Sequence, residues 1–324
     1  GLGSLKLEGI FVPHVTPFDE REEIDLDGLR ELVRFLGGAG VQGLVVLGST
    51  GENVHLGREE KEKILEVVLE ETSLPVIAGA TENSVKETVR LARDLCDMGA
   101  ENLLITTPYY FKLREDEVYR YFSEVLSSVD AGVVLYNVPK FTSCSISLEV
   151  IERLVEEHSN VIGVKDSGGS IGRIAELLRR VGGRISVLAG TGDLIFPTLA
   201  LGGHGAVAAV ANVVPDVCSE IYRSFKEGDY RRSAELQILV NQLDVVLVKK
   251  YNQIAAIKRA MENLQQAGQQ LGKILYEEAA KKQAASASTA EAAGQASPPP
   301  EQGDQAKKKV DSDVIDAEFE AKDK

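Results

Sequence analysis

Lys165 stands at the end of a short apolar segment, Asn-Val-Ile-Gly-Val, and is followed by Asp-Ser-Gly-Gly. The valine and isoleucine residues indicate a buried strand, so the lysine lies where this strand meets a loop. Such a lysine can bury its aliphatic stem and extend its ammonium group into water. Alternatively, burial destabilises the ammonium form, and the neutral amine can attack a carbonyl carbon. The local sequence alone fits both a structural and a catalytic lysine.

A lysine that forms a Schiff base with a 2-oxo acid needs two kinds of helper group. A proton shuttle must serve the carbinolamine, and hydrogen-bond donors must hold the substrate carboxylate. Tyr136 can be the shuttle. The segment Gly-Ser-Thr-Gly-Glu offers backbone N–H groups at a glycine-permitted turn, together with the hydroxyl groups of Ser49 and Thr50. The hydroxyl group of Tyr110 can extend a proton relay through Thr50.

Each helper residue also has a structural interpretation. Tyr136 can simply end a strand, and Ser-Thr-Gly-Glu is a common turn or helix-entry sequence. Tyr110 can line the mouth of a barrel with its amphipathic ring. Because all of these residues follow apolar segments, one shared site is favoured over several unrelated features.

Apolar segments and amphipathic helical segments alternate along the first two-thirds of the chain. Most of the apolar segments are rich in β-branched residues and end in Gly, Pro, Asn, Asp or Thr, as buried strands do. Eight such alternations predict a (β/α)8 TIM barrel, with a doubly wound parallel sheet as the alternative. The expected strands lie within residues 9–15, 43–48, 75–80, 102–108, 132–139, 161–166, 185–190 and 205–212.

The period of a strand predicts how the candidate residues meet. Side chains alternate between the two faces of a strand. Gly163 and Lys165 therefore lie on the same face of their strand, and Val134 and Tyr136 lie on the same face of theirs. If both faces point into the barrel, Lys165 and Tyr136 lie on adjacent strands at the same end. In a barrel this is the end at which catalytic groups gather.

Composition excludes several classes of function. The 324 residues carry a net charge of -14, and an acidic surface without a basic stripe disfavours nucleic acid binding. No apolar run reaches the ~18 residues that a membrane span needs. Cys96, Cys144 and Cys218 lack metal-ligand spacing, and reduced thiols are expected. With no signal-peptide pattern at the start, we expect a soluble cytoplasmic protein.

The composition changes towards the C-terminus. We expect a catalytic barrel over residues 1–215 and a helical region over residues 216–281. Residues 282–324 are rich in Ala, Ser, Gln, Pro and Lys and end in an acidic segment. Since they offer little apolar surface to offset chain entropy, they are predicted to form a disordered tail.

The chain resembles the pyruvate-dependent class I aldolase family, which includes dihydrodipicolinate synthase, N-acetylneuraminate lyase and 2-keto-3-deoxygluconate aldolase. The resemblance runs from about Gly9 to about Arg259. It implies pyruvate and an aldehyde as substrates, neither a metal nor an organic cofactor, and a homo-oligomer, either a dimer or a tetramer. It rests on TPF at 16–18, GSTGE at 48–52, TPYY at 107–110, YNVP at 136–139, GVKD at 163–166 and GGHGAVAAVANVVP at 202–215.

The resemblance also implies a role for each candidate residue. Lys165 would form the Schiff base, and Tyr136 would relay protons. Ser49 and Thr50 would hold the pyruvate carboxylate and complete the relay. The remaining implied site residues are Tyr110, which would reach into a neighbouring subunit's site, and the pocket-lining Gly190 and Val207.

One departure from the family pattern bears on the substrate. Dihydrodipicolinate synthases carry an arginine, which meets the carboxylate of the aldehyde substrate, at the position of Phe141. Phenylalanine cannot make that charge-assisted contact. We therefore expect reversible cleavage of a 2-keto-3-deoxy sugar acid, with dihydrodipicolinate synthesis from pyruvate and aspartate semialdehyde as the alternative. A second alternative is a non-catalytic barrel or interaction protein.

A second departure begins at about Met261. From there the sequence resembles the extreme C-terminus of a bacterial DnaK-type chaperone, with a last lid helix, a low-complexity linker and an acidic end containing Asp-Ala-Glu-Phe-Glu. The nucleotide-binding and peptide-binding parts of such a chaperone are absent from this sequence, so no chaperone activity is implied.

Overall fold

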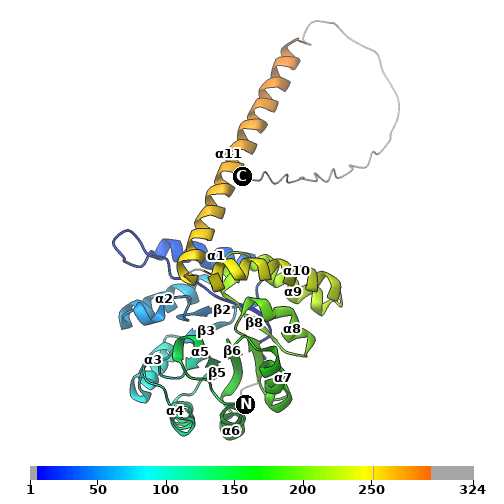
Figure 1. Cartoon of the computed structure of the whole chain (residues 1–324). Helices are drawn as coiled ribbons and strands as arrows, with labels where there is room; N and C mark the ends of the chain where they lie inside the picture. Colours follow the sequence, from blue (N-terminus) through cyan, green and yellow to red (C-terminus); the bar gives the residue numbers. More distant parts are fainter. Residues whose placement is uncertain (1–5, 251, 293–324) are drawn as a thin grey trace, which may run out of the picture. The chain divides into compact units, whose positions relative to one another are not determined.

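A computed structural model describes residues 6–250 and 252–292. Eight parallel strands form a closed barrel in the order of the sequence, and β8 pairs with β1 (Figure 1). This closure confirms the predicted (β/α)8 barrel and rules out a doubly wound sheet, which would have two free edges. The strands are β1 (Gly9–Pro13), β2 (Gly43–Val46), β3 (Val76–Gly79), β4 (Asn102–Thr106), β5 (Gly132–Asn137), β6 (Val161–Asp166), β7 (Ser186–Ala189) and β8 (Gly205–Val207).

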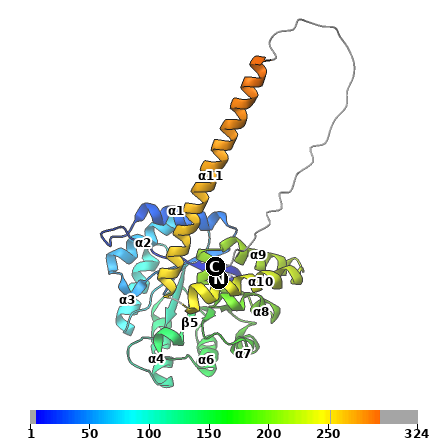
Figure 2. The same ribbon diagram turned by 45° about the horizontal axis from the view of Figure 1, so that its top comes forward.

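Helices surround the strands, and α9 and α10 lie side by side next to α8 (Figures 1 and 2). The α-helices are α1 (Leu26–Gly38), α2 (Arg58–Glu71), α3 (Val85–Asp97), α4 (Glu115–Ser128), α5 (Pro139–Thr142), α6 (Leu148–Glu157), α7 (Ile171–Val181), α8 (Ile195–Ala200), α9 (Pro215–Lys226), α10 (Tyr230–Asp244) and α11 (Gln253–Ala292). Short 3-10 helices are η1 (Asn53–His55), η2 (Gly192–Leu194) and η3 (Ala209–Asn212), and Val245–Lys250 forms a π-helix, η4.

Side-chain caps fix where several helices begin. Ser147 accepts a hydrogen bond from the backbone N–H of Val150 at 3.2 Å, and Asp25 accepts one from Gly28 at 2.9 Å. Each such cap stabilises its helix by about 1 kcal/mol.

Two clusters of buried apolar side chains make up the core. The larger one fills the space between the strands and the helices. The smaller one fills the interior of the barrel. Because side chains alternate along a strand, neighbouring residues of one strand contribute to different clusters. The interior cluster consists of Leu7, Phe11, Val45, Ile77, Leu104, Val134, Tyr136, Val138, Leu188 and Val207.

The C-terminal part differs from the expectation. Residues 282–292, predicted to be disordered, continue α11, because alanine, glutamine and glutamate favour a helix even where little can be buried. Residues 293–324 of the predicted tail lie outside the described residues. The chain divides into two compact units, Gly1–Gln266 and Ala267–Lys324, whereas the predicted boundaries at residues 215 and 281 stay predictions. No described helix is both long enough and apolar enough to cross a bilayer.

Candidate active site

Lys165 and Tyr136 are direct partners in the pairing of β6 with β5. The lysine is 4% exposed and the tyrosine 6%, and Tyr136 belongs to the cluster inside the barrel. The ammonium nitrogen Nζ lies 4.0 Å from the centre of the tyrosine ring. The alternation of the two strands therefore placed both residues correctly, at the carboxyl-terminal end of the barrel.

The phenol of Tyr136 lies in a polar environment. Burial raises its pKa, but the positive charge of Lys165 and hydrogen bonds from Ser49, Lys165 and Ser167 outweigh burial and hold the pKa below its ordinary value. A phenol with a lowered pKa gives up its proton more readily. Beside an amine, it can pass protons to and from a carbinolamine.

The two hydroxyl groups of the Gly-Ser-Thr-Gly-Glu loop point to different partners. Ser49 Oγ lies 3.4 Å from the phenol oxygen of Tyr136. Thr50 Oγ1 instead accepts a hydrogen bond from Gln253 Nε2 at 3.3 Å. The structure therefore brings Ser49 next to Tyr136, and among the described residues no hydrogen bond joins Thr50 to the phenol. The relay role expected of Ser49 and Thr50 stays a prediction.

The same loop is closed by its own backbone hydrogen bonds. The N–H groups of Gly51 and Glu52 donate to Gly48 O and Ser49 O, each at 3.1 Å. Thr16 Oγ1 donates to Gly51 O at 2.7 Å from the segment after β1. The N–H groups of Gly51 and Glu52 are thus engaged. The loop's remaining candidates for holding a carboxylate are the hydroxyl and N–H groups of Ser49 and Thr50.

Tyr110 is not part of the site within one chain. Its side chain is 89% exposed and stacks edge to face on Phe111, with ring centres 5.1 Å apart. Its φ is +90°, a value that costs a non-glycine residue free energy. Among the described residues no hydrogen bond joins Tyr110 to Thr50, so the expected relay is not formed in a single chain.

The structure shows what surrounds Gly190 and Val207, whose role as a pocket wall stays a prediction. Gly190 follows β7 and donates its N–H to Asp166 O at 2.7 Å. A Cβ atom there would lie 2.0 Å from Ser167 Oγ, so the close approach of the two loops requires glycine. Val207, at the end of β8, is buried in the same interior cluster as Tyr136.

A buried polar network lies next to Lys165 and Tyr136, and the sequence did not lead us to expect it. Asp166 follows Lys165 and is fully buried; it accepts hydrogen bonds from Arg173 Nε at 2.7 Å, Asn137 Nδ2 at 2.9 Å and Gly168 N at 3.0 Å. The sequence did carry a signal for this network. Asn137 follows Tyr136 and Asp166 follows Lys165, so the two polar side chains lie at the same register on the faces of β5 and β6 opposite to Tyr136 and Lys165. Buried polar groups of this kind need partners.

Phe141 lies on α5, directly after β5, and is 50% exposed. The ammonium group of Lys140 lies 5.2 Å from the centre of its ring. Residue 141, after β5, therefore presents an aromatic ring with the ammonium group of Lys140 beside it.

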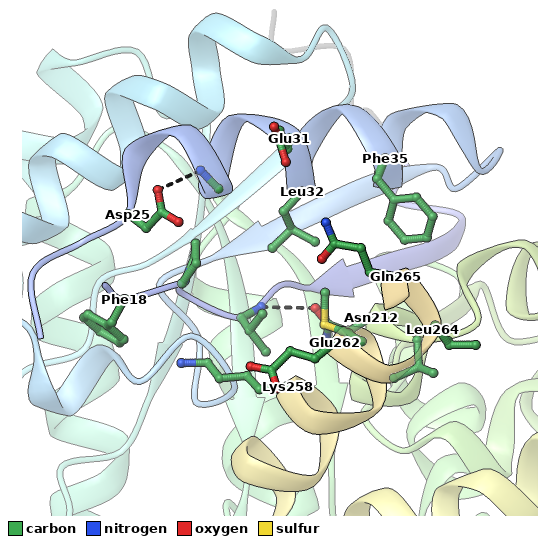
Figure 3. A pocket seen from close by; sticks show the side chains of 15 residues that line it. Phe18, Asp25, Glu31, Leu32, Phe35, Asn212, Lys258, Glu262, Leu264 and Gln265 are labelled. Atoms are coloured by element: carbon green, nitrogen blue, oxygen red, sulfur yellow. Dashed lines mark hydrogen bonds between the residues drawn. The ribbon is translucent and has the colours of Figure 1, made fainter. Parts of the chain in front are cut away.

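A groove of about 730 Å³ lies elsewhere on the unit that contains the barrel (Figure 3). It is lined by α1, the segment around Phe18, the end of η3 and the first turns of α11. Neither Lys165 nor Tyr136 lines it, so the groove is separate from the candidate active site.

The closed parallel barrel, with a buried lysine at the end of its sixth strand, defines a (β/α)8-barrel enzyme scaffold. The profile of the dihydrodipicolinate synthetase family matches residues 6–292. The chain belongs to this family. Its members are class I lyases and aldolases, so the protein is an enzyme of that class and not a non-catalytic barrel. The match includes residues 261–292, where we expected the aldolase resemblance to have ended; the chaperone resemblance stays a prediction.

Named relatives agree with the family. The chain is 35% identical over 260 residues to a 4-hydroxy-tetrahydrodipicolinate synthase of Methanopyrus kandleri, covering 79% of this chain and 86% of the relative. A DapA-like lyase of Pyrococcus horikoshii, described as uncharacterized, is 37% identical over 70% of this chain and 79% of its own.

Solved structures agree as well. The dihydrodipicolinate synthase of Aquifex aeolicus superposes with a TM-score of 0.74 at 34% identity, covering 77% of this chain and 86% of that one. YagE, a prophage protein of the same family from E. coli K12, was solved in complex with pyruvate. It superposes with a TM-score of 0.76 at 32% identity, covering 79% of this chain and 87% of that one.

Proposed function

We propose that the protein is a 4-hydroxy-tetrahydrodipicolinate synthase that condenses pyruvate with aspartate semialdehyde through an imine on Lys165. The observation that carries the chemistry is the buried pair of Lys165 and Tyr136, with the amine 4.0 Å from the phenol ring. The choice of aldehyde is supported by the relatives that bear this name. It replaces our first expectation, a sugar-acid aldolase, as the leading candidate.

The reaction proceeds in steps that these side chains can serve. The neutral amine of Lys165 attacks C2 of pyruvate and forms a carbinolamine. Tyr136 donates a proton to the departing hydroxyl group, water leaves, and an imine remains. The Tyr136 phenolate accepts a proton from C3, which gives an enamine. C3 then forms a carbon–carbon bond with the aldehyde carbon, whose oxygen takes up a proton. The amino group of aspartate semialdehyde attacks the imine carbon, the ring closes, and the bond to Lys165 breaks, which regenerates the free amine.

The other residues hold the substrate and renew the proton on Tyr136. Ser49 contacts the phenol and exchanges protons with it. The hydroxyl group of Thr50, with the N–H groups of Ser49 and Thr50, holds the pyruvate carboxylate, while Gly190 and Val207 line the wall. Because Tyr110 is exposed in one chain, we assign it to the site of a second copy in a homo-oligomer. Cytoplasmic location also stays a prediction.

A second candidate function rests on Phe141. Its half-exposed ring offers no bidentate contact to the carboxylate of aspartate semialdehyde. A hydroxylated aldehyde without that carboxylate does not need such a contact. Reversible cleavage of a 2-keto-3-deoxy sugar acid therefore remains the competing function for the same Lys165 chemistry.

Borohydride trapping tests the proposal. The full chain is incubated with pyruvate and borohydride, which reduces an imine to a stable amine, and the adduct is located by peptide mass spectrometry. We expect one adduct on Lys165 in the wild type and none in Lys165→Ala. Trapping elsewhere, or near-normal turnover by Lys165→Ala, would contradict the mechanism. Rates with aspartate semialdehyde and with glyceraldehyde then decide between the two substrates.

A further inference from the structure

Gln253 begins α11 and reaches a residue 203 positions earlier in the chain. Its side-chain Nε2 donates to Thr50 Oγ1 at 3.3 Å. Thr50 is buried, so this hydroxyl group has little access to bulk water. The contact therefore links the helix that follows the barrel to one hydroxyl group of the candidate active site.

The direction of this hydrogen bond constrains the hydroxyl proton of Thr50. An amide NH₂ group donates and cannot accept, whereas a hydroxyl group has one proton to donate and lone pairs to accept. Since Gln253 occupies a lone pair of Thr50 Oγ1, the Thr50 proton must point to a different acceptor. In the proposed reaction the available acceptor is the carboxylate of pyruvate.

A second contact keeps the start of α11 against the same loop. Lys258 Nζ donates to Glu52 Oε2 at 2.8 Å and lies 4.8 Å from the centre of the Phe18 ring. Figure 3 shows Lys258 extending from α11 towards Phe18. Ile257, between the two contacts, is fully buried. Gln253 is thus presented by a packed helical turn, and not by a free loop.

We propose that Gln253 is a positioning residue: by donating to Thr50, it turns the Thr50 hydroxyl proton towards the pyruvate carboxylate and strengthens pyruvate binding. The inference rests on the proposed function, because it requires that pyruvate binds at Lys165. It is independent of which aldehyde follows, since imine formation precedes the aldehyde.

The test measures the pyruvate concentration that gives half-maximal borohydride trapping on Lys165. Gln253→Met keeps the length of the side chain but removes the donor, and we expect that concentration to rise about three- to tenfold, the effect of one hydrogen bond. The maximal rate of trapping should change less than about twofold. Gln253→Glu can only accept, so it draws the Thr50 proton away and adds a negative charge. We expect a rise of more than about tenfold.

A double-mutant comparison separates this role from a structural one. In a Thr50→Val background, Gln253→Met should have no further effect, because the hydroxyl group through which it acts is gone. Lys258→Met, which releases the other contact of α11, is the matched control and should not reproduce the selective loss of pyruvate binding.

The outcomes are distinguishable. An unchanged half-maximal concentration in Gln253→Met, unchanged or tighter binding in Gln253→Glu, or an undiminished effect of Gln253→Met in the Thr50→Val background overturns the inference alone. If Lys258→Met raises the half-maximal pyruvate concentration as much as Gln253→Met does, the inference is also overturned, because the contacts then act only by holding α11 against the loop. If folded wild-type protein traps no pyruvate on Lys165, the proposed function fails and the inference fails with it.

Discussion

The side-chain oxygens of Ser49 and Tyr136 lie 3.4 Å apart, although the two residues are 87 positions apart in the chain. Tyr136 also lies next to Lys165 on the neighbouring strand. The phenol therefore contacts both the amine and a hydroxyl group, which are the two contacts that a proton-relaying group needs. Thr50, next to Ser49 in sequence, is turned to Gln253 instead.

These different contacts predict different kinetic effects when the hydroxyl groups of Tyr136, Ser49 and Thr50 are removed one at a time. Tyr136→Phe should lower kcat by about 10²–10⁴, as loss of general acid–base help does. Ser49→Ala should also lower kcat, by less, because Tyr136 keeps its phenol. Thr50→Ala should chiefly raise KM for pyruvate. Steady-state kinetics checks all three. A fall in kcat with Thr50→Ala but not with Ser49→Ala would contradict the assignment.

The network around Asp166 predicts that the fold loses stability when the ion pair with Arg173 is broken. Arg173→Met leaves a fully buried carboxylate without its cation, and breaking such a pair costs about 3–5 kcal/mol. Urea denaturation measures the free energy of unfolding. The control is Arg153→Met, which removes an exposed ion pair with Glu157 and should cost less than about 1 kcal/mol. Equal losses of unfolding free energy in the two variants would show that the buried carboxylate of Asp166 does not need the charge of Arg173.

The ring of Phe141 predicts a change of specificity. If aspartate semialdehyde enters over α5, Phe141→Arg gives its carboxylate a bidentate partner. The ratio of kcat/KM for aspartate semialdehyde to that for glyceraldehyde should then rise about tenfold or more. Lys140→Arg, one residue earlier, is the matched control, since it changes the cation without replacing the ring. A ratio that stays constant in Phe141→Arg would mean that the aldehyde does not approach residue 141.

Sequence reasoning placed Lys165 and Tyr136 well because their placement depends on local rules. Parallel strands in sequence order put their ends together, and alternation decides which side chains face the barrel. The same rules say little about a loop, and so the roles of Ser49 and Thr50 were not separated. Gln253 could not be found this way, because its contact with Thr50 depends on how α11 packs after the barrel is complete. The extent of α11 was missed for another reason: composition predicted little burial but does not exclude a helix.

Asp244 predicts how stability depends on pH. Burial, together with the nearby charge of Asp193, raises its pKa from 3.8 to about 6, against the opposing charge of Lys249. An acid whose pKa is raised by folding binds its proton more tightly in the native state. Its contribution to stability is therefore fully present below about pH 4 and is lost as the pH rises through about 6.

Asp244→Asn removes this titration while keeping the shape of the side chain. The Tm of the variant relative to the wild type should therefore rise between about pH 4 and about pH 6 and stay level above about pH 6, so that it is higher at pH 8 than at pH 4. Thermal melts of the variant and the wild type across this range check the sign. A difference between Asp244→Asn and wild type that shrinks as the pH rises would show that the ion pair of Asp244 with Lys249, 3.8 Å apart, outweighs burial.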